Sequence, residues 1–244
     1  MLFRENTRMS DVIHANYLLL SILNRFDIQL GFGDKTIAEV CSEHAVNTGF
    51  FLEIINSFHD HDYFPQINLQ SYSLRMILGY IRKSHQFYIE KKIPYIEKLI
   101  SDLVHSSSET DKKSFKLIEE FFQGYKTELI EHIENEENNV YPYVLAIDKA
   151  VTSGEVNDYH YEMITKNSIN KFADEHSNIE DKLYDLKNLI IKYLPPSNDY
   201  TLSNTLLIEL FRLEQDLNDH ARIEDKVLVP KVRHIENVLM KSLQ

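Results

Sequence analysis

The sequence predicts an all-α protein, in which a small helical N-terminal domain precedes an antiparallel up-down four-helix bundle. Glycine and proline are scarce, six of each in 244 residues, which favours long helices over a turn-rich sheet. Apolar residues recur at helical spacing through four long segments after about residue 70. The polar connections between these segments are short, as is typical of antiparallel neighbours in a bundle.

Each predicted bundle helix has a recognisable end. The first stops at HSSSETD (105–111), a polar stretch suited to a turn and to a new N-cap. The second is followed by the looser stretch DKAVTSGEVND, and the third is stopped by Pro195 and Pro196, which cannot continue a helix. The approximate helical ranges are 71–103, 112–147, 159–193 and 201–241.

The N-terminal region has a different pattern. Residues 1–64 predict several shorter helices, broken by LGFGDKT (30–36) and by HAVNTG (44–49). The segment HDHDYFPQINLQ (59–70) contains a proline and several charges, so it is the predicted linker. We therefore expect two domains, 1–64 and 71–241.

Composition and charge exclude several classes of protein. The net charge of −12 argues against binding to a nucleic acid backbone or to an anionic membrane surface. No apolar run approaches the length of a bilayer span, and the first residues lack the apolar core of a signal peptide. The single cysteine, Cys41, excludes an intrachain disulfide and metal sites built from several thiolates. These features predict a cytoplasmic protein.

An internal repeat carries the chemistry. Residues 132–142 read HIENEENNVYP and residues 220–230 read HARIEDKVLVP, so both follow His-x-x-x-Glu-acid-x-x-x-x-Pro. A histidine and a glutamate four residues apart lie on one helix face, one turn apart. A single such pair is a weak signal, but two copies that agree at every patterned position are hard to obtain by chance. The repeat predicts His132, Glu136, His220 and Glu224 as metal ligands.

Register adds two further histidines. His85, His132, His176 and His220 stand at similar distances on either side of the connections between their helices. Each residue rises about 1.5 Å along a helix, so in an antiparallel bundle these four histidines should share one level. All four also fall on the apolar stripe of their helix. One buried histidine is more often a hydrogen-bonded core residue, but four at one level with two partnered glutamates predict a metal site.

The donor set limits the metal. Imidazole and carboxylate without thiolate suit iron, manganese or zinc. Two carboxylates able to bridge suggest two ions, and bundle interiors are where dinuclear carboxylate sites are built. We expect two non-haem iron ions, with manganese or zinc as alternatives. Six protein ligands cannot saturate two octahedral ions, so open positions should remain for water, dioxygen or nitric oxide.

At these residues the chain resembles the hemerythrin-like (HHE) di-iron family, and more closely its branch of Repair of Iron Centres proteins. The resemblance covers nearly the whole chain and implies one histidine from each bundle helix, with a glutamate from the second and fourth. It also implies two acidic residues near the metals, which fall on Glu128 and Glu175. Glu180, four residues after His176, has no clear family role and is an open candidate for an extra ligand. The implied metal ligands are His85, His132, Glu136, His176, His220 and Glu224.

The N-terminal domain resembles that of the same branch, with one difference. RFDIQLGFGDKTIAEVC (25–41) aligns with a motif that usually carries two adjacent cysteines, where this chain has Gly31 and Phe32. A thiol role of that pair is therefore absent here. Cys41 lies further along, and we expect it to be a small buried apolar residue.

The resemblance implies a stress-response protein that restores iron–sulfur clusters damaged by oxidants or nitric oxide, by donating iron or by handling nitric oxide. Its partners would be damaged iron–sulfur proteins or small diatomic molecules. The alternative is a reversible sensor or carrier of dioxygen or nitric oxide. A transcription regulator is a third reading of TIAEVCSEHAVNTGFFLEIIN (36–56), but its would-be recognition helix has no lysine or arginine for phosphates or base edges. Catalytic activity, the physiological reductant and a homodimer stay open.

Overall fold

The computed structural model describes residues 1–108, 111–175, 179–194 and 200–242, and the side chains of these except for 173–175 and 179–181. The described residues form helices, turns and loops without a strand, so the all-α prediction is confirmed. None of the helices in these ranges has the length and hydropathy that would let it cross a membrane.

The chain divides into two compact units. One comprises Met1–Ser84 with Lys226–Leu228, and the other comprises His85–Asp225 with Val229–Gln244. The helix α6 (Leu74–Phe87) begins in the first unit and carries His85 at the start of the second. The domain ranges expected from the sequence, 1–64 and 71–241, stay a prediction.

The first unit is built from short helices whose ends follow local chemistry. Gly31 and Gly33 lie in the connection between α2 and α3, with φ values of 104° and 59° that glycine adopts without strain. Thr36 then begins α3 with a capping box, in which its side chain accepts from the Glu39 amide and Glu39 accepts from the Thr36 amide. Asn47 caps α4 through the Phe50 amide. The helices are α1 (Met9–Ala15), α2 (Leu20–Arg25), α3 (Ile37–Glu43), α4 (Thr48–His59) and α5 (Gln66–Ser71), with the short 3₁₀ turn η1 (Tyr17–Leu19) before α2.

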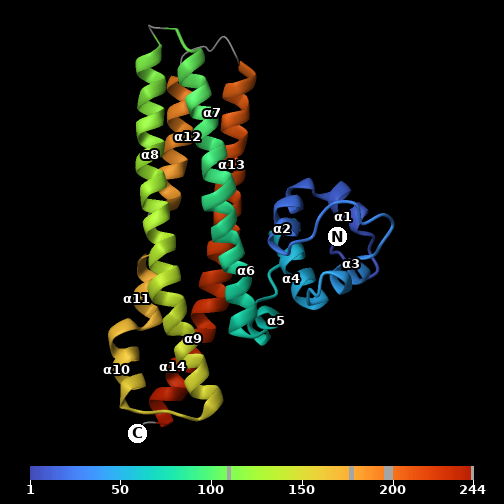
Figure 1. Ribbon diagram of the computed structural model, residues 1–244, viewed down its shortest axis with the longest axis vertical. Helices are drawn as coiled ribbons and strands as arrows, with labels where there is room; N and C mark the ends of the chain where they lie inside the picture. Colours follow the sequence, from blue (N-terminus) through green and yellow to red (C-terminus); the bar gives the residue numbers. More distant parts are fainter. Residues whose placement is uncertain (109–110, 176–178, 195–199, 243–244) are drawn as a thin grey trace. The chain divides into compact units, whose positions relative to one another are not determined.

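The second unit contains the predicted bundle. Its long helices lie side by side in Figure 1, and contacts join α7 to α8, α8 to α12, α12 to α13 and α13 to α7. Buried apolar side chains fill the interior, among them Ile100, Phe122, Leu186 and Leu210, one from each helix. Burial of these stripes is the main source of bundle stability. The four helices are α7 (Ile93–Ser106), α8 (Lys112–Asn135), α12 (Ile179–Tyr193) and α13 (Tyr200–Ile223).

Further helices extend the bundle beyond the level of His85. The helix α9 (Tyr141–Ser153) continues α8, and α14 (Val229–Ser242) continues α13 and contacts α9. The shorter helices α10 (Asp158–Asn167) and α11 (Ile169–Glu175) pack against α14.

Along the described chain, π-helical turns interrupt three of the helical runs: η2 (Tyr88–Lys92), η3 (Glu136–Val140) and η5 (Glu224–Leu228). Each is followed by a proline at the second position of the next α-helix: Pro94, Pro142 and Pro230. A proline in a helix clashes with the carbonyl four residues before it. That carbonyl belongs to the middle residue of each π turn, so the wider turn makes room for the proline ring.

The third predicted helix does not run unbroken from 159 to 193. It ends at Asn167 and begins again at Ile169, because Ser168 is extended with ψ of 137°. The Glu236 carboxylate of α14 accepts a hydrogen bond of 2.8 Å from the Ile169 amide and caps the second segment. The predicted stop at Pro195 and Pro196 lies outside the described residues.

Candidate metal centre

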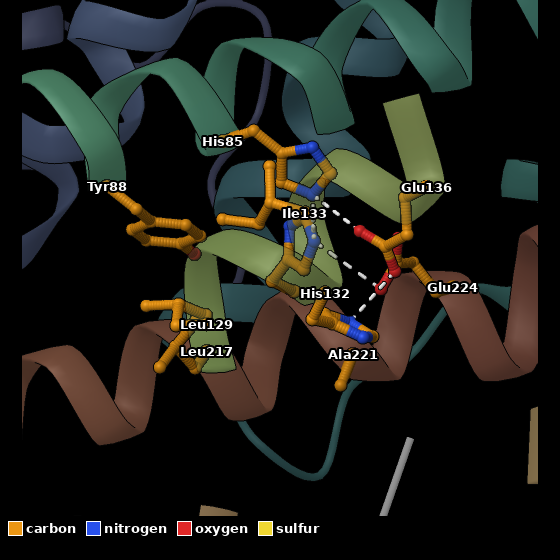
Figure 2. A pocket seen from close by; sticks show the side chains of 10 residues that line it. His85, Tyr88, Leu129, His132, Ile133, Glu136, Leu217, Ala221 and Glu224 are labelled. Atoms are coloured by element: carbon orange, nitrogen blue, oxygen red, sulfur yellow. Dashed lines mark hydrogen bonds and ion pairs between the residues drawn. The ribbon is translucent and has the colours of Figure 1, made fainter. Parts of the chain in front are cut away.

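Two histidines and two glutamates of the second unit converge in the bundle interior (Figure 2). His85 comes from α6 and His220 from α13, while Glu136 and Glu224 are the first residues of η3 and η5. One ligand atom from each of the four side chains lies within 4.8 Å of all the others. All four residues are buried, with exposed fractions between 0% and 6%. A group of this kind can hold a metal ion.

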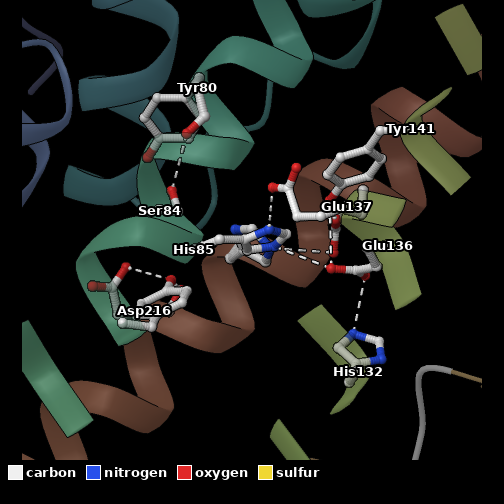
Figure 3. Close-up of polar contacts among 11 residues, drawn as sticks. Tyr80, Ser84, His85, His132, Glu136, Glu137, Tyr141 and Asp216 are labelled. Atoms are coloured by element: carbon white, nitrogen blue, oxygen red, sulfur yellow. Dashed lines mark hydrogen bonds and ion pairs between the residues drawn. The ribbon is translucent and has the colours of Figure 1, made fainter. Parts of the chain in front are cut away.

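Glu136 stands between two imidazoles. Its Oε1 lies 3.0 Å from His132 Nε2, and its Oε2 lies 3.1 Å from His85 Nε2 (Figure 3). The His132 side chain is 22% exposed, so it lies at the solvent-facing edge of the group. The two oxygens of the Glu136 carboxylate thus face imidazole nitrogens from two different helices, α8 and α6.

His220 completes the group from the opposite side. Its Nε2 lies 3.1 Å from His85 Nε2 and 3.4 Å from Glu224 Oε2. The two imidazole nitrogens and the carboxylate oxygens therefore surround one small volume. His220 Nδ1, by contrast, has no hydrogen-bond partner among the described residues.

One side of the group is polar. The Tyr141 hydroxyl donates to Glu224 Oε1 at 2.8 Å and also lies 3.4 Å from Glu136 Oε2. The Tyr141 ring stacks on His85, with 5.8 Å between ring centroids. Burial raises the pKa of Tyr141 well above its usual value, and the charges of Glu224 and Glu136 raise it further. The phenol therefore stays protonated and acts as a donor.

His85 has a carboxylate on each ring nitrogen. Its Nδ1 lies 2.9 Å from Glu137 Oε1, while its Nε2 faces Glu136. Burial alone would lower the pKa of His85, but hydrogen bonds to Glu136 and Glu137 and the charges of Glu136 and Glu224 raise it to about 9. In the metal-free protein the ring is therefore protonated at neutral pH, and a bound cation would take the place of that proton.

A cavity of about 40 Å³ lies at the group, and half of the residues that line it are the predicted ligands His85, His132, Glu136, His220 and Glu224. Leu129, Ile133, Leu217 and Ala221 line it, together with the Tyr88 ring (Figure 2). The Tyr88 hydroxyl donates to Asp216 at 3.2 Å. The hydroxyl is therefore engaged with Asp216, and Tyr88 contributes its aromatic ring to the cavity wall. A water needs roughly 10–15 Å³ of such volume, so the cavity has room for a few small molecules.

The donor set fits a divalent cation. Buried carboxylates at 0% and 1% exposure are expensive unless positive charge compensates them. Imidazole nitrogen and carboxylate oxygen together suit iron, manganese and zinc. The donor atoms of the buried His/Glu group are therefore those of a metal-binding site, and they are consistent with iron.

The structure brings five of the six predicted ligands together. His85, Glu136, His220 and Glu224 form the close group, and His132 joins it through Glu136. His176 lies outside the described residues, as do the side chains of Glu175 and Glu180. Glu128 forms an ion pair with Lys182 of α12. The assignment of ligands and of nearby acidic residues stays a prediction.

Two residues of the site were not singled out from the sequence. Glu137 occupies the acidic position of the repeat, so the pattern marked it without showing that its partner is His85 of another helix. Tyr141 precedes the proline of the first copy, where the second copy has Val229. Because the copies differ there, the repeat carried no signal for Tyr141.

Residues 94–232 match the family model of the hemerythrin HHE cation binding domain. This range is more than half of the chain, and the chain belongs to that family. It is also similar to the iron-sulfur cluster repair protein ScdA of Staphylococcus haemolyticus (strain JCSC1435), with 22% identity over 204 residues, which cover 82% of this chain and 85% of the relative. The resemblance to the repair branch of hemerythrin-like proteins is confirmed.

Proposed function

We propose that the second unit binds two non-haem iron ions, bridged by Glu136 and Glu224. The observation that carries the proposal is that the two oxygens of Glu136 face imidazoles from two different helices, at 3.0 Å and 3.1 Å. A carboxylate in this position can join two cations, one beside His132 and one beside His85. The proposed ligands are His85, His132, Glu136, His176, His220 and Glu224.

With these ions bound, we propose that the protein restores damaged iron–sulfur clusters under oxidative or nitrosative stress. Iron at the site would supply metal to a damaged cluster or bind nitric oxide. The similarity to a relative named for iron–sulfur cluster repair supports this role. Damaged iron–sulfur proteins are then the partners.

The chain's own residues have separable tasks in this proposal. Glu137 accepts a hydrogen bond from His85 Nδ1, which leaves the Nε2 lone pair available to a cation. The apolar side chains around the cavity limit water beside the ligands.

The proposal is tested in two stages. Protein purified without oxygen should contain about two irons per chain, and His132→Ala should contain less; one zinc per chain would contradict the site. The iron-loaded protein should then reactivate an enzyme with an oxidatively damaged iron–sulfur cluster better than the same amount of free ferrous iron. Equal reactivation by free iron would contradict the repair role.

A reversible sensor or carrier of dioxygen or nitric oxide is the second candidate. The apolar side chains of Leu129, Ile133 and Leu217 in the cavity wall favour it, because they suit a neutral diatomic molecule beside the predicted ligands. An absorbing adduct that forms with oxygen and disappears on deoxygenation would support this function. Irreversible oxidation of the ferrous protein under the same conditions would contradict it.

A further inference from the structure

Tyr141 contacts both glutamates of the buried group and lies outside the predicted ligand set. It is fully buried, and its hydroxyl lies 2.8 Å from Glu224 Oε1 and 3.4 Å from Glu136 Oε2. These glutamates come from different helical runs, η5 and η3. Tyr141 itself is the first residue of α9, directly after η3, so its backbone moves with Glu136.

We propose that Tyr141 is a positioning residue that holds the two metal-binding carboxylates together before and after metal enters. This inference rests on the proposed metal site. Two carboxylates in a buried site repel each other, and each loses solvation. A phenol has one proton to donate. Tyr141 donates it in the shorter hydrogen bond to Glu224, while its oxygen also stays close to Glu136.

The stacked contact with His85 strengthens the argument. The two rings are nearly parallel, at 11°, so Tyr141 also limits how far the His85 imidazole can rotate. One side chain therefore restrains three of the predicted ligands. Without the hydroxyl, Glu224 would be free to turn away from Glu136. Metal binding would then have to reorder the Glu224 side chain, which lowers the affinity for the metal.

The chain offers a matched control two residues away. Tyr143 lies in the same helix, is also buried, and donates its hydroxyl to the buried carboxylate of Glu236. Glu236 is not part of the metal group. Tyr143→Phe therefore removes the same chemical group from a glutamate that binds no metal in this proposal.

The experiment compares the wild type, Tyr141→Phe and Tyr143→Phe by titrating the metal-free protein with ferrous iron, without oxygen, against a chromogenic chelator. We expect Tyr141→Phe to weaken iron binding about 10- to 100-fold, as loss of a residue that orients a metal ligand does, and Tyr143→Phe to change it less than twofold. The visible absorption of the iron-loaded protein should shift in Tyr141→Phe alone. Melting of the metal-free protein is recorded for each variant.

The outcomes separate this inference from the proposed function. If the wild type binds no iron, the proposed function itself fails. If the wild type binds iron and Tyr141→Phe matches it within twofold and in its spectrum, only the role of Tyr141 is overturned. Equal weakening in both variants, with equal losses of melting temperature, would also overturn it, because general destabilisation would then explain the effect.

Discussion

At the scale of single residues, the contacts of His85 decide which of its nitrogens can bind a cation. A neutral imidazole carries one proton. With that proton on Nδ1 and donated to Glu137, the lone pair of Nε2 points to Glu136 and His220. Glu137 thus selects the tautomer that a metal needs, and it adds negative charge next to the ring.

We expect Glu137→Gln to lower the affinity for ferrous iron about 10- to 100-fold. The amide keeps the size of the side chain but removes the charge that stabilises the Nδ1 proton. Glu134→Gln is the matched control, since Glu134 is exposed near the end of α8, just before η3. Chelator competition measures both variants, and equal affinities in the two would contradict a role of Glu137 in orienting His85.

Cys41, unlike His85, is a buried group whose surroundings make it unreactive. Burial raises the pKa of Cys41 to about 11 from 9.0, although a hydrogen bond with Thr48 opposes the shift. The pKa of the Cys41 thiol is higher in the folded than in the unfolded chain. The contribution of this thiol to the free energy of unfolding is therefore fully present below pH 9 and is lost as the pH rises through about 11.

At pH 8 we therefore expect iodoacetamide to label Cys41 at least about 100-fold more slowly in the folded protein than in guanidinium, since only the thiolate reacts. Mass spectrometry of the labelled chain gives both rates. Fast labelling of the folded protein would show an accessible thiolate. It would then reopen a thiol role for the N-terminal unit, which has Gly31 and Phe32 where the repair branch has cysteines.

At the scale of helices, the π turns connect the repeat to the geometry of the site. Glu136 and Glu224 are the first residues of η3 and η5. A π turn holds one residue more than an α turn, which changes the direction of every later side chain. The extra residue thus lets the ligands of α8 and the buried residues of α9, such as Tyr143, face the interior together.

Deleting Asn139 tests this phase relation. Asn139 is exposed within η3, but its removal should restore a regular helix and rotate α9 by about 100° relative to α8. We expect loss of iron binding and a large drop in melting temperature by circular dichroism. Asn139→Ala keeps the residue count and should stay within about 0.5 kcal/mol of the wild type. A deletion variant with normal iron content would contradict the argument.

Tertiary contacts explain what the helical pattern missed. The break at Ser168 has no proline or glycine to mark it. It depends on Glu236, which lies far along the chain and accepts from the Ile169 amide and from the Tyr143 hydroxyl. Local sequence cannot show such a cap. The prolines of the repeat were visible, but the sequence did not indicate that they accompany π turns.

At the scale of the whole molecule, the site follows from the antiparallel order of the helices. His85, His132 and His220 are far apart in sequence, and similar distances from the connections predicted that they share one level. This part of the site could be predicted from the sequence, because helical rise and register depend on residue numbers alone. Tyr141 and Glu137 could not be assigned roles, because their contacts depend on side-chain directions between different helices.

Metal binding should therefore stabilise the fold as well as serve function. The ligands come from helical runs that meet in the folded bundle, so the unfolded chain lacks the site. Binding adds RT ln(1 + [L]/Kd) to the free energy of unfolding, about 2.7 kcal/mol at 100 times Kd. For a chain of 244 residues, this corresponds to roughly 5 to 10 °C in melting temperature.

We expect ferrous iron, added without oxygen, to raise the melting temperature by that amount and a chelator to reverse the rise. His132→Ala and Glu224→Gln should show little or no rise, since each lacks a proposed ligand. Calorimetry at several iron concentrations makes the comparison quantitative, because a true binding effect continues to grow with the logarithm of the concentration. A wild type whose melting temperature ignores iron, or a His132→Ala variant that gains as much as the wild type, would mean that the cation binds elsewhere. Because the buried group His85, Glu136, His220 and Glu224 is assembled from three helical runs, the free energy of metal binding and that of assembling the bundle are coupled.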